Sequence, residues 1–170
     1  MKILETTRLI LRELTIDDKY ELSKILSDKE SMKYYPHPFT DIEVENWIKW
    51  NIENYKKYNH GLWAVVLKEK NVFLGDCGIT LQEIDNEQLP ELGYHIKKEY
   101  NNLGYATEAA KACINYAFNE LNIKTLYSYT TTDNLPSQKV ALKIGMKFVK
   151  KFNKKLYENQ IEELLFSIFS

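Results

Sequence analysis

One stretch of the sequence combines the residue types and the spacing of an anion-binding turn. Residues 91–96 predict a strand, and residues 101–104, Asn-Asn-Leu-Gly, lead directly into a predicted helix. The N-terminus of a helix directs unpaired backbone N–H groups and the positive end of the helix dipole toward one point, where phosphate binds well. Gly104 allows the backbone to approach a ligand or to take a positive φ, and Ala106 keeps the next turn free of bulk. Taken alone, the same pattern also fits a strand-to-helix turn with no ligand.

Other phosphate-binding patterns and metal-binding patterns are missing. The sequence contains no GxxxxGK[ST] motif, and no GxGxxG motif opens a βαβ unit near the N-terminus. His37 and His60 fall in predicted loops and form no three-ligand cluster with His95, so no metal is expected. Cys77 and Cys113 are far apart in the sequence and lack metal-ligand spacing. We therefore expect neither a zinc site nor a disulfide framework, and a reducing compartment fits best.

The composition favours one globular domain spanning residues 1–170. A length of 170 residues suffices for one full core and is short for two ordinary domains. Hydrophobic residues make up 44% of the chain and charged residues 28%, a charged share that is unusual for a membrane protein. The 23 basic and 24 acidic side chains nearly cancel, so nucleic acid is not an expected partner. No apolar run has the length of a signal peptide or a membrane span, so we expect a cytoplasmic protein that binds no membrane.

The N-terminal half of the chain predicts strands and helices in alternation. Residues 8–14 alternate apolar and charged side chains, as in a half-buried strand. Thr15 can cap a first helix, and the spacing of Thr40 and Glu43 is that of a capping box at the start of a second helix. Two β-prone runs follow, at residues 62–67 and 73–81.

The C-terminal half continues this pattern. Residues 105–121 predict the clearest helix, whose small alanines on one face allow close packing against a sheet. Asp133 or Asn134 can begin a shorter helix, which Gly145 ends. The remaining predictions are a strand at 125–130, the shorter helix at 136–144, and two strands at 148–152 and 164–169. Together these elements predict a mixed α/β domain.

Five motifs in a fixed order are more specific than any one of them. They are residues 5–12 (Glu-Thr-Thr-Arg-Leu-Ile-Leu-Arg), 74–79 (Leu-Gly-Asp-Cys-Gly-Ile), 91–96 (Glu-Leu-Gly-Tyr-His-Ile), 104–109 (Gly-Tyr-Ala-Thr-Glu-Ala), and Asn134-Leu135-Pro136-Ser137 leading to Lys143-Ile144-Gly145-Met146. With them the chain resembles the GNAT superfamily of N-acetyltransferases, and within it the branch that includes the ribosomal-protein N-terminal acetyltransferases. The resemblance implies a mostly antiparallel sheet of about six to seven strands, splayed at its central strands and flanked by about four helices.

The same resemblance implies acetyl-coenzyme A as co-substrate and indicates where it binds. Its pyrophosphate would lie on the loop of residues 101–107, and its pantetheine arm would lie near Asn134. The implied cofactor-binding residues are Tyr94, His95, Ile96, Asn101, Asn102, Leu103, Gly104, Tyr105, Ala106, Thr107, Asn134 and Ser137. The family's loop reads (Q/R)xxGx(G/A), usually with a further glycine after its first position, whereas this chain has Asn101 and Asn102 there. Asparagine tolerates the left-handed region and offers an amide donor.

Acetyl transfer to an amine requires a neutral amine, stabilisation of the carbonyl oxygen and a proton for the departing thiolate. Glu91 is the first candidate for the base, because a partly buried carboxylate at the start of the cofactor strand can have a raised pKa. A solvated strand-end residue is the alternative interpretation of Glu91, and His95 is a second candidate base. Ser137 and Tyr129 are candidates for the proton donor, since the resemblance places residues 134–137 beside the sulfur.

The sequence leaves the acceptor open. Aromatic side chains between the first two helices and the later strands either line an amine pocket or pack the helices; they are Tyr34, Tyr35, His37, Phe39, Trp47 and Trp50. The implied activity is direct acetyl transfer to a primary amine of a protein N-terminus or a small molecule. A non-catalytic acyl-coenzyme A sensor of the same fold is the alternative function. Residues 164–169 form an apolar segment suited to an interface, so a monomer and a homodimer are both compatible with the sequence.

Overall fold

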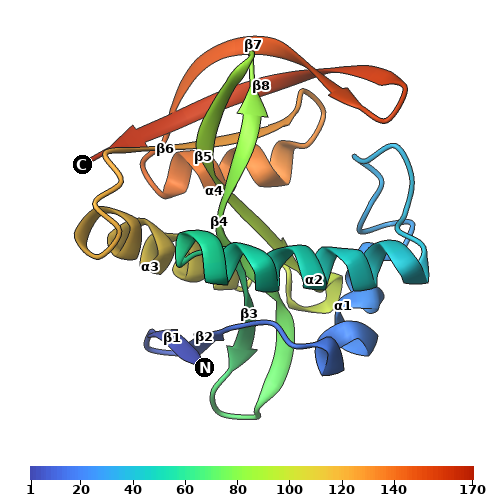
Figure 1. Cartoon of the computed structure of the whole chain (residues 1–170), viewed down its shortest axis with the longest axis vertical. Coiled ribbons are helices and arrows are strands. Elements are labelled where there is room, and N and C mark those ends of the chain that lie inside the picture. The colour runs from blue at the N-terminus through green and yellow to red at the C-terminus, as the bar shows by residue number, and fades with distance from the viewer.

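Eight strands form one sheet in the computed structural model, which describes all residues 1–170. The strands are β1 (Lys2–Glu5), β2 (Leu9–Arg12), β3 (Leu62–Leu67), β4 (Val72–Ile84), β5 (Glu87–Ile96), β6 (Thr125–Thr131), β7 (Lys147–Leu156) and β8 (Asn159–Phe169). Their order across the sheet is β1-β2-β3-β4-β5-β6-β8-β7 (Figure 1). Every neighbouring pair is antiparallel except β5 and β6, which run parallel. The predicted mixed, mostly antiparallel sheet is thus confirmed.

The sheet contains eight strands where about six to seven were expected, and β1 is the strand that the sequence pattern does not reveal. This four-residue segment has no fully buried side chain, so it carries no clear apolar alternation. Its pairing with β2 at the edge of the sheet defines it instead. Strands β4 and β5 are also longer than the patterns at 73–81 and 91–96, because they continue pairing as a hairpin up to Ile84 and Glu87.

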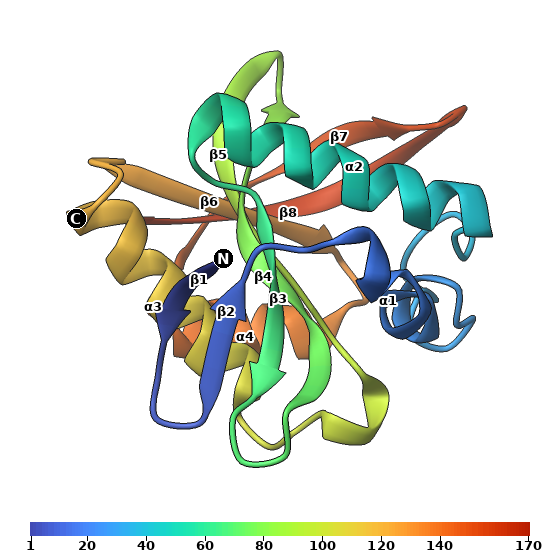
Figure 2. The same ribbon diagram turned by 60° about the horizontal axis from the view of Figure 1, so that its bottom comes forward.

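Four α-helices cover the two faces of the sheet. They are α1 (Lys19–Leu26), α2 (Asp41–Tyr58), α3 (Tyr105–Asn119) and α4 (Leu135–Lys143), and short 3-10 turns occupy Ile16–Asp18 and Lys98–Tyr100. Val44 and Ile48 of α2 pack with the buried residues of α1 in one apolar cluster that includes Ala64 and Phe73. The buried residues of α3 and α4 pack in another cluster, with Cys77 and Ile79. Figure 2 shows the two pairs of helices on either side of the strands. None of these helices combines the length and apolar character that crossing a bilayer requires.

Local capping chemistry begins two of the helices where the sequence predicts. The Thr40 hydroxyl accepts a hydrogen bond from the Glu43 N–H at 3.2 Å, and the Glu43 carboxylate accepts one from the Thr40 N–H at 2.7 Å. This capping box satisfies backbone donors at both positions and begins α2. The Asn134 side chain accepts a hydrogen bond from the Ser137 N–H at 3.2 Å, so Asn134 caps α4.

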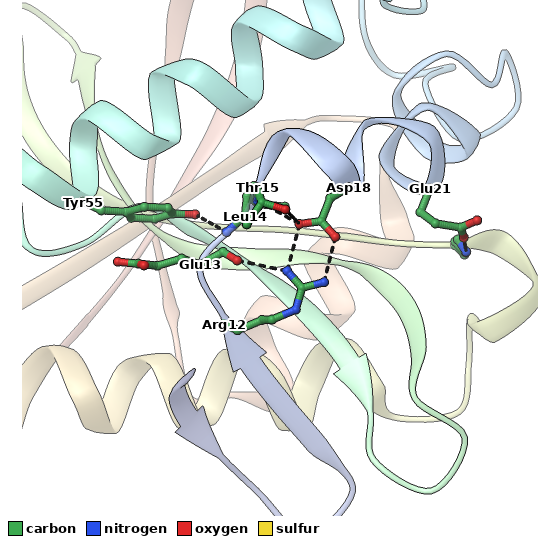
Figure 3. A network of polar contacts seen from close by, with 8 residues as sticks. Arg12, Glu13, Leu14, Thr15, Asp18, Glu21 and Tyr55 are labelled. Carbon is green, nitrogen blue, oxygen red and sulfur yellow. Dashed lines mark hydrogen bonds and ion pairs between the residues drawn. The ribbon is translucent and has the colours of Figure 1, made fainter. Parts of the chain in front are cut away.

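A polar network fixes the junction between β2, α1 and α2 (Figure 3). The Arg12 guanidinium donates to both oxygens of Asp18 at 2.7 and 2.8 Å, and the Thr15 N–H donates to the same carboxylate at 2.8 Å. The Tyr55 hydroxyl of α2 accepts a hydrogen bond from the Leu14 N–H at 3.1 Å. A bidentate arginine–carboxylate pair has a defined geometry, so it orients α1 relative to the sheet. The network therefore helps to hold α1 and α2 over one face of the central strands.

The central strands separate where β5 and β6 meet. Only Glu91 and Tyr127 are paired between these parallel strands, although both strands continue beyond that point. By contrast, β4 and β5 remain in register from Gly75 opposite Ile96 to Ile84 opposite Glu87. The predicted splay of the sheet is therefore located between β5 and β6.

Candidate active site

A cavity of about 370 Å³ occupies the splay between β5 and β6. Successive residues of a strand point to opposite faces of the sheet, and paired residues share a face. Glu91 and His95 therefore lie on the face that bears Asp76, which is covered by α1 and α2. Tyr94, on the opposite face, hydrogen-bonds to Ser137 of α4. Because side chains from both faces line the cavity, it connects the two sides of the sheet.

On the α3 side, the cavity leads to a helix N-terminus that no side chain caps. Gly104 is the N-cap of α3 with a φ of 83°, and its backbone has no side-chain capping partner. Asn102 also takes a positive φ, of 61°, as asparagine tolerates. The first N–H groups of α3 have no partners within the helix, so this turn has the features of an anion site.

Arg8 and Glu108 fix the shape of this turn. The Arg8 guanidinium donates to the Leu103 carbonyl oxygen at 3.0 Å and to the Glu108 carboxylate at 2.6 Å. It also stacks over the Tyr105 ring, with 4.3 Å between the guanidinium carbon and the ring centroid. Sequence reasoning gave neither Arg8 nor Glu108 a role at the turn, although both lie within the motifs that carry the resemblance. Their partnership spans about a hundred residues, so only the folded chain reveals it.

The predicted cofactor-binding residues divide into two groups. One group lines the cavity: Tyr94, His95, Ile96, Asn101, Ala106, Asn134 and Ser137. The other group forms or directly follows the turn at the start of α3: Asn102, Leu103, Gly104, Tyr105 and Thr107. His95 differs from its neighbours because its ring lies on the Glu91 face, away from Tyr94 and α4.

The Tyr94 side chain places a protonated hydroxyl on the α4 side of the cavity. Its hydroxyl donates to the Ser137 carbonyl oxygen at 3.0 Å and lies 3.3 Å from the Ser137 hydroxyl oxygen. Burial raises the pKa of Tyr94 to about 12, so its hydroxyl keeps its proton near neutral pH. Sequence reasoning assigned Tyr94 only to cofactor binding, because the contact with α4 depends on the tertiary fold.

Glu91 lies in the cavity wall on the other side. Burial of its carboxylate raises the pKa to about 7, and the nearby charge of His95 opposes that rise. The Thr80 hydroxyl donates to the carboxylate at 3.3 Å. Gly93, two residues along the same strand, leaves room beside the carboxylate, since a Cβ there would lie 3.2 Å from an oxygen of Glu91. A carboxylate with this pKa can accept a proton at neutral pH.

A chain of hydrogen bonds runs along the same wall. The Trp47 indole N–H donates to one oxygen of Asp76 at 3.1 Å, and the other oxygen is 2.7 Å from His95 Nδ1. His95 Nε2 lies 2.8 Å from the Tyr35 hydroxyl. Burial lowers the pKa of His95, but the charge and hydrogen bond of the fully buried Asp76 outweigh this effect and raise it. Sequence reasoning missed Asp76, which appears there only as a polar position in an apolar strand.

The remaining sequence candidates have different surroundings. Tyr129 lines the cavity on the Glu91 face, and its hydroxyl donates to the side-chain oxygen of Gln82 at 3.3 Å. Of the six aromatic candidates for the acceptor region, Tyr34, Tyr35 and Trp47 line the cavity. His37 instead pairs with Glu43 at 3.1 Å. Cys77 and Cys113 are free and buried, and no group of three or more potential metal ligands forms.

The sequence matches the profile of the acetyltransferase (GNAT) domain over residues 8–147. The chain belongs to the GNAT acetyltransferase family. It is 37% identical to YkkB of Bacillus subtilis over 155 residues, which cover 89% of this chain and 90% of YkkB. It is 32% identical to the N-acetyltransferase YnaD of the same organism, over 84% of this chain and 81% of YnaD. The protein is thus an N-acetyltransferase that uses acetyl-coenzyme A.

Solved structures share the fold over the whole chain. A GNAT-family acetyltransferase from Bacillus anthracis has a TM-score of 0.82 and 28% identity, covering 99% of this chain and 98% of its own. RimL, a ribosomal L7/L12 alpha-N-protein acetyltransferase solved in complex with coenzyme A, has a TM-score of 0.81 at 15% identity, covering 99% of this chain and 98% of its own. These similarities show that the chain has the GNAT fold. The structural neighbours include ribosomal-protein acetyltransferases.

Proposed function

We propose that the protein transfers acetyl directly to a primary amine in the cavity between β5 and β6. Glu91 acts as the general base and Tyr94 as the proton donor. The observation that carries this proposal is the division of the cavity by the sheet. Glu91 lies on the face covered by α1 and α2, while Tyr94 contacts α4 on the opposite face. An amine and a thioester can therefore approach each other through the splay from opposite sides.

The residues on the α3 and α4 side fit acetyl-coenzyme A. The uncapped N-terminus of α3 offers backbone N–H groups to a pyrophosphate, and Arg8 holds the turn in place. Asn134 and Ser137 line the cavity where a pantetheine arm would enter. Bound acetyl-coenzyme A supplies an activated acetyl thioester, the chemistry that the chain itself lacks.

Two proton transfers by the chain accompany the exchange of a C–S bond for a C–N bond. Glu91 accepts a proton from the attacking amine, because its pKa of about 7 lets it act as a base at neutral pH. The Tyr94 hydroxyl donates a proton to the departing sulfur. The Ser137 hydroxyl, 3.3 Å away and partly exposed, can relay a proton from solvent back to Tyr94, and Glu91 returns its proton to solvent. Ser137 and Tyr129 are the alternative donors that the sequence suggests.

The hydrogen-bonded chain Trp47–Asp76–His95–Tyr35 holds the His95 ring on the acceptor side of the cavity. Asp76 raises the pKa of His95, which favours its protonated form. That positive charge restrains the rise in the pKa of Glu91 and keeps part of the carboxylate ionised at neutral pH. In this proposal His95 lowers the pKa of the base Glu91 and does not itself accept the proton of the amine.

The acceptor is a primary amine of a small molecule or a protein N-terminus. A non-catalytic sensor is not favoured, because a carboxylate with a pKa near 7 faces the splay and close relatives are acetyltransferases. We further propose that residues 1–170 act as one domain in the cytoplasm, as a monomer or homodimer, without binding a membrane or nucleic acid. Sedimentation and fractionation test these assignments.

The pH dependence of Glu91→Gln tests the mechanism. We expect the wild-type kcat/KM, followed by thiol release, to rise with pH through about 7 as Glu91 loses its proton. The acceptor amine adds its own titration at higher pH. In Glu91→Gln, the rise of kcat/KM near pH 7 (the limb of the pH profile) should disappear. The kcat should fall about 100-fold, within the range of general-base contributions.

A matched control is Glu87→Gln, at the exposed start of the same strand. It should leave the profile unchanged, and both variants should bind acetyl-coenzyme A as wild type does. A Glu91→Gln enzyme that retains both its rate and the limb near pH 7 would exclude Glu91 as the base.

A further inference from the structure

Glu163 is a buried carboxylate that the reaction described above does not use. The residue is only 3% exposed, yet it sits in the middle of β8 and lines the cavity. One of its carboxylate oxygens, Oε2, is buried and has no hydrogen-bond partner. Burying a carboxylate oxygen without a partner is unfavourable unless the group is neutral or meets a cation. Its position in the wall of a substrate cavity suggests that the partner comes from the substrate.

The register of the sheet places Glu163 beyond Glu91 on the same face. Glu163 pairs with Thr131 of β6, and Tyr127 of the same strand pairs with Glu91 of β5. The two carboxylates therefore point to the face covered by α1 and α2, with one strand between their backbones. Adjacent strands lie about 4.8 Å apart, so the backbones are separated by at least roughly 10 Å across the sheet.

Lys154 is the cation whose charge acts on Glu163, and that charge opposes the rise in the pKa of Glu163, but its ammonium is hydrogen-bonded to another group. Lys154 of β7 donates to the Glu83 carbonyl oxygen at 2.7 Å, and its ammonium lies 4.9 Å from the centroid of the Tyr129 ring. Burial lowers the pKa of Lys154. Asp133 and Glu91 add further negative charge around Glu163, and burial raises its pKa to about 7. The far end of the cavity thus carries more negative than positive charge.

We propose that Glu163 binds a second ammonium group of the acceptor, so that the preferred substrates are aliphatic diamines rather than monoamines. This inference rests on the proposed function, since Glu91 must deprotonate the reacting amine while Glu163 holds the distal one. The nitrogens of such a substrate are separated by a chain of several methylene groups, which the aromatic wall of Tyr129 and Trp47 can contact.

Paired substrates test the proposal. The probes are 1,4-diaminobutane and n-butylamine, which differ by one amino group, with longer diamines to map the best spacing. We expect wild type to prefer 1,4-diaminobutane by at least tenfold in kcat/KM. Glu163→Gln should lower the value for the diamine about tenfold more than the value for n-butylamine, mainly through KM.

Glu162→Gln provides the matched control. Glu162 is the preceding residue of β8, is half exposed and pairs with Lys151 on the surface. This variant should keep the wild-type preference, and thermal melts should show that both variants fold. Equal losses for diamine and monoamine in Glu163→Gln, or no diamine preference in wild type, would overturn the proposal.

A binding measurement separates this inference from the proposed function. Calorimetry of 1,4-diaminobutane with the protein saturated in coenzyme A requires no turnover. Binding that weakens about tenfold in Glu163→Gln supports the ammonium site even if no amine is acetylated, an outcome that would overturn only the proposed function. Acetylation of monoamines without Glu163-dependent diamine binding would overturn only the inference.

Discussion

The two halves of the cavity are built in different ways. The half on the α3 side uses backbone: an uncapped helix N-terminus at Gly104 and a turn braced by Arg8. The half under α1 and α2 uses side chains from separate elements: Glu91 on β5 and Glu163 on β8 line it, and Asp76 on β4 holds His95 from behind. In the proposed function, the backbone on the α3 side binds the pyrophosphate of the co-substrate, whatever the acceptor is, and the side chains on the other side select the amine. Variants in the first half should therefore change the affinity for acetyl-coenzyme A, and variants in the second half should change the acceptor and the pH profile.

Gly104→Asp should give the largest effect, confined to the α3 half. The substitution places a carboxylate at the helix N-terminus and strains a residue whose φ is 83°. We expect affinity for acetyl-coenzyme A to fall at least about 100-fold by calorimetry, which corresponds to roughly 2.7 kcal/mol.

Gly104→Asn separates the charge from the backbone strain, because asparagine is neutral and tolerates a positive φ. Its loss of affinity should be much smaller than that of Gly104→Asp. Unchanged affinity in Gly104→Asp would place the pyrophosphate away from this turn.

Tyr94→Phe tests where the two halves meet. The variant removes the hydroxyl that contacts Ser137 but keeps the ring. We expect kcat to fall about tenfold, the equivalent of 1.4 kcal/mol in the barrier, while affinity for acetyl-coenzyme A changes little. Tyr129→Phe, on the other face, serves as the comparison. If Tyr129→Phe lowers kcat more than Tyr94→Phe does, the proton donor lies on the acceptor side and the proposed division of roles is wrong.

Asp76→Asn should give the smallest effect, and it should appear in the pH profile. Without the charge of Asp76, burial favours neutral His95, which no longer lowers the pKa of Glu91. The charge of Asp76 itself raises the pKa of Glu91, so its loss acts the other way, but this influence is smaller than that of His95. The pKa of Glu91 therefore rises, less of it is ionised at pH 7, and the limb near pH 7 moves to higher pH. We expect kcat/KM at pH 7 to fall about threefold, with recovery at higher pH.

The double variant Glu91→Gln with Asp76→Asn is the control for this shift. This variant lacks the Glu91 carboxylate, which titrates, so its kcat/KM should show no rise near pH 7 that could shift. A limb that stays in place in Asp76→Asn would show that His95 has no electrostatic influence on the base.

Much of the fold could be predicted because its signals are local. The capping box at Thr40 and the cap at Asn134 both appear in the structure, since each depends on residues within one helical turn. The edge strand Lys2–Glu5 could not be predicted, because pairing with β2 defines it rather than a pattern of its own. The ends of β4 and β5 were missed for the same reason.

The site divides along the same line. By itself, the sequence determined the glycine turn before α3, the family resemblance and Glu91 as a candidate base, because these depend on contiguous motifs. Only the tertiary structure brought Arg8 to the turn, Asp76 to His95 and Glu163 into the cavity wall. The reason is physical: the electrostatics of a buried side chain depend on the charges and apolar groups around it, and in this sheet those neighbours come from strands far apart in the sequence.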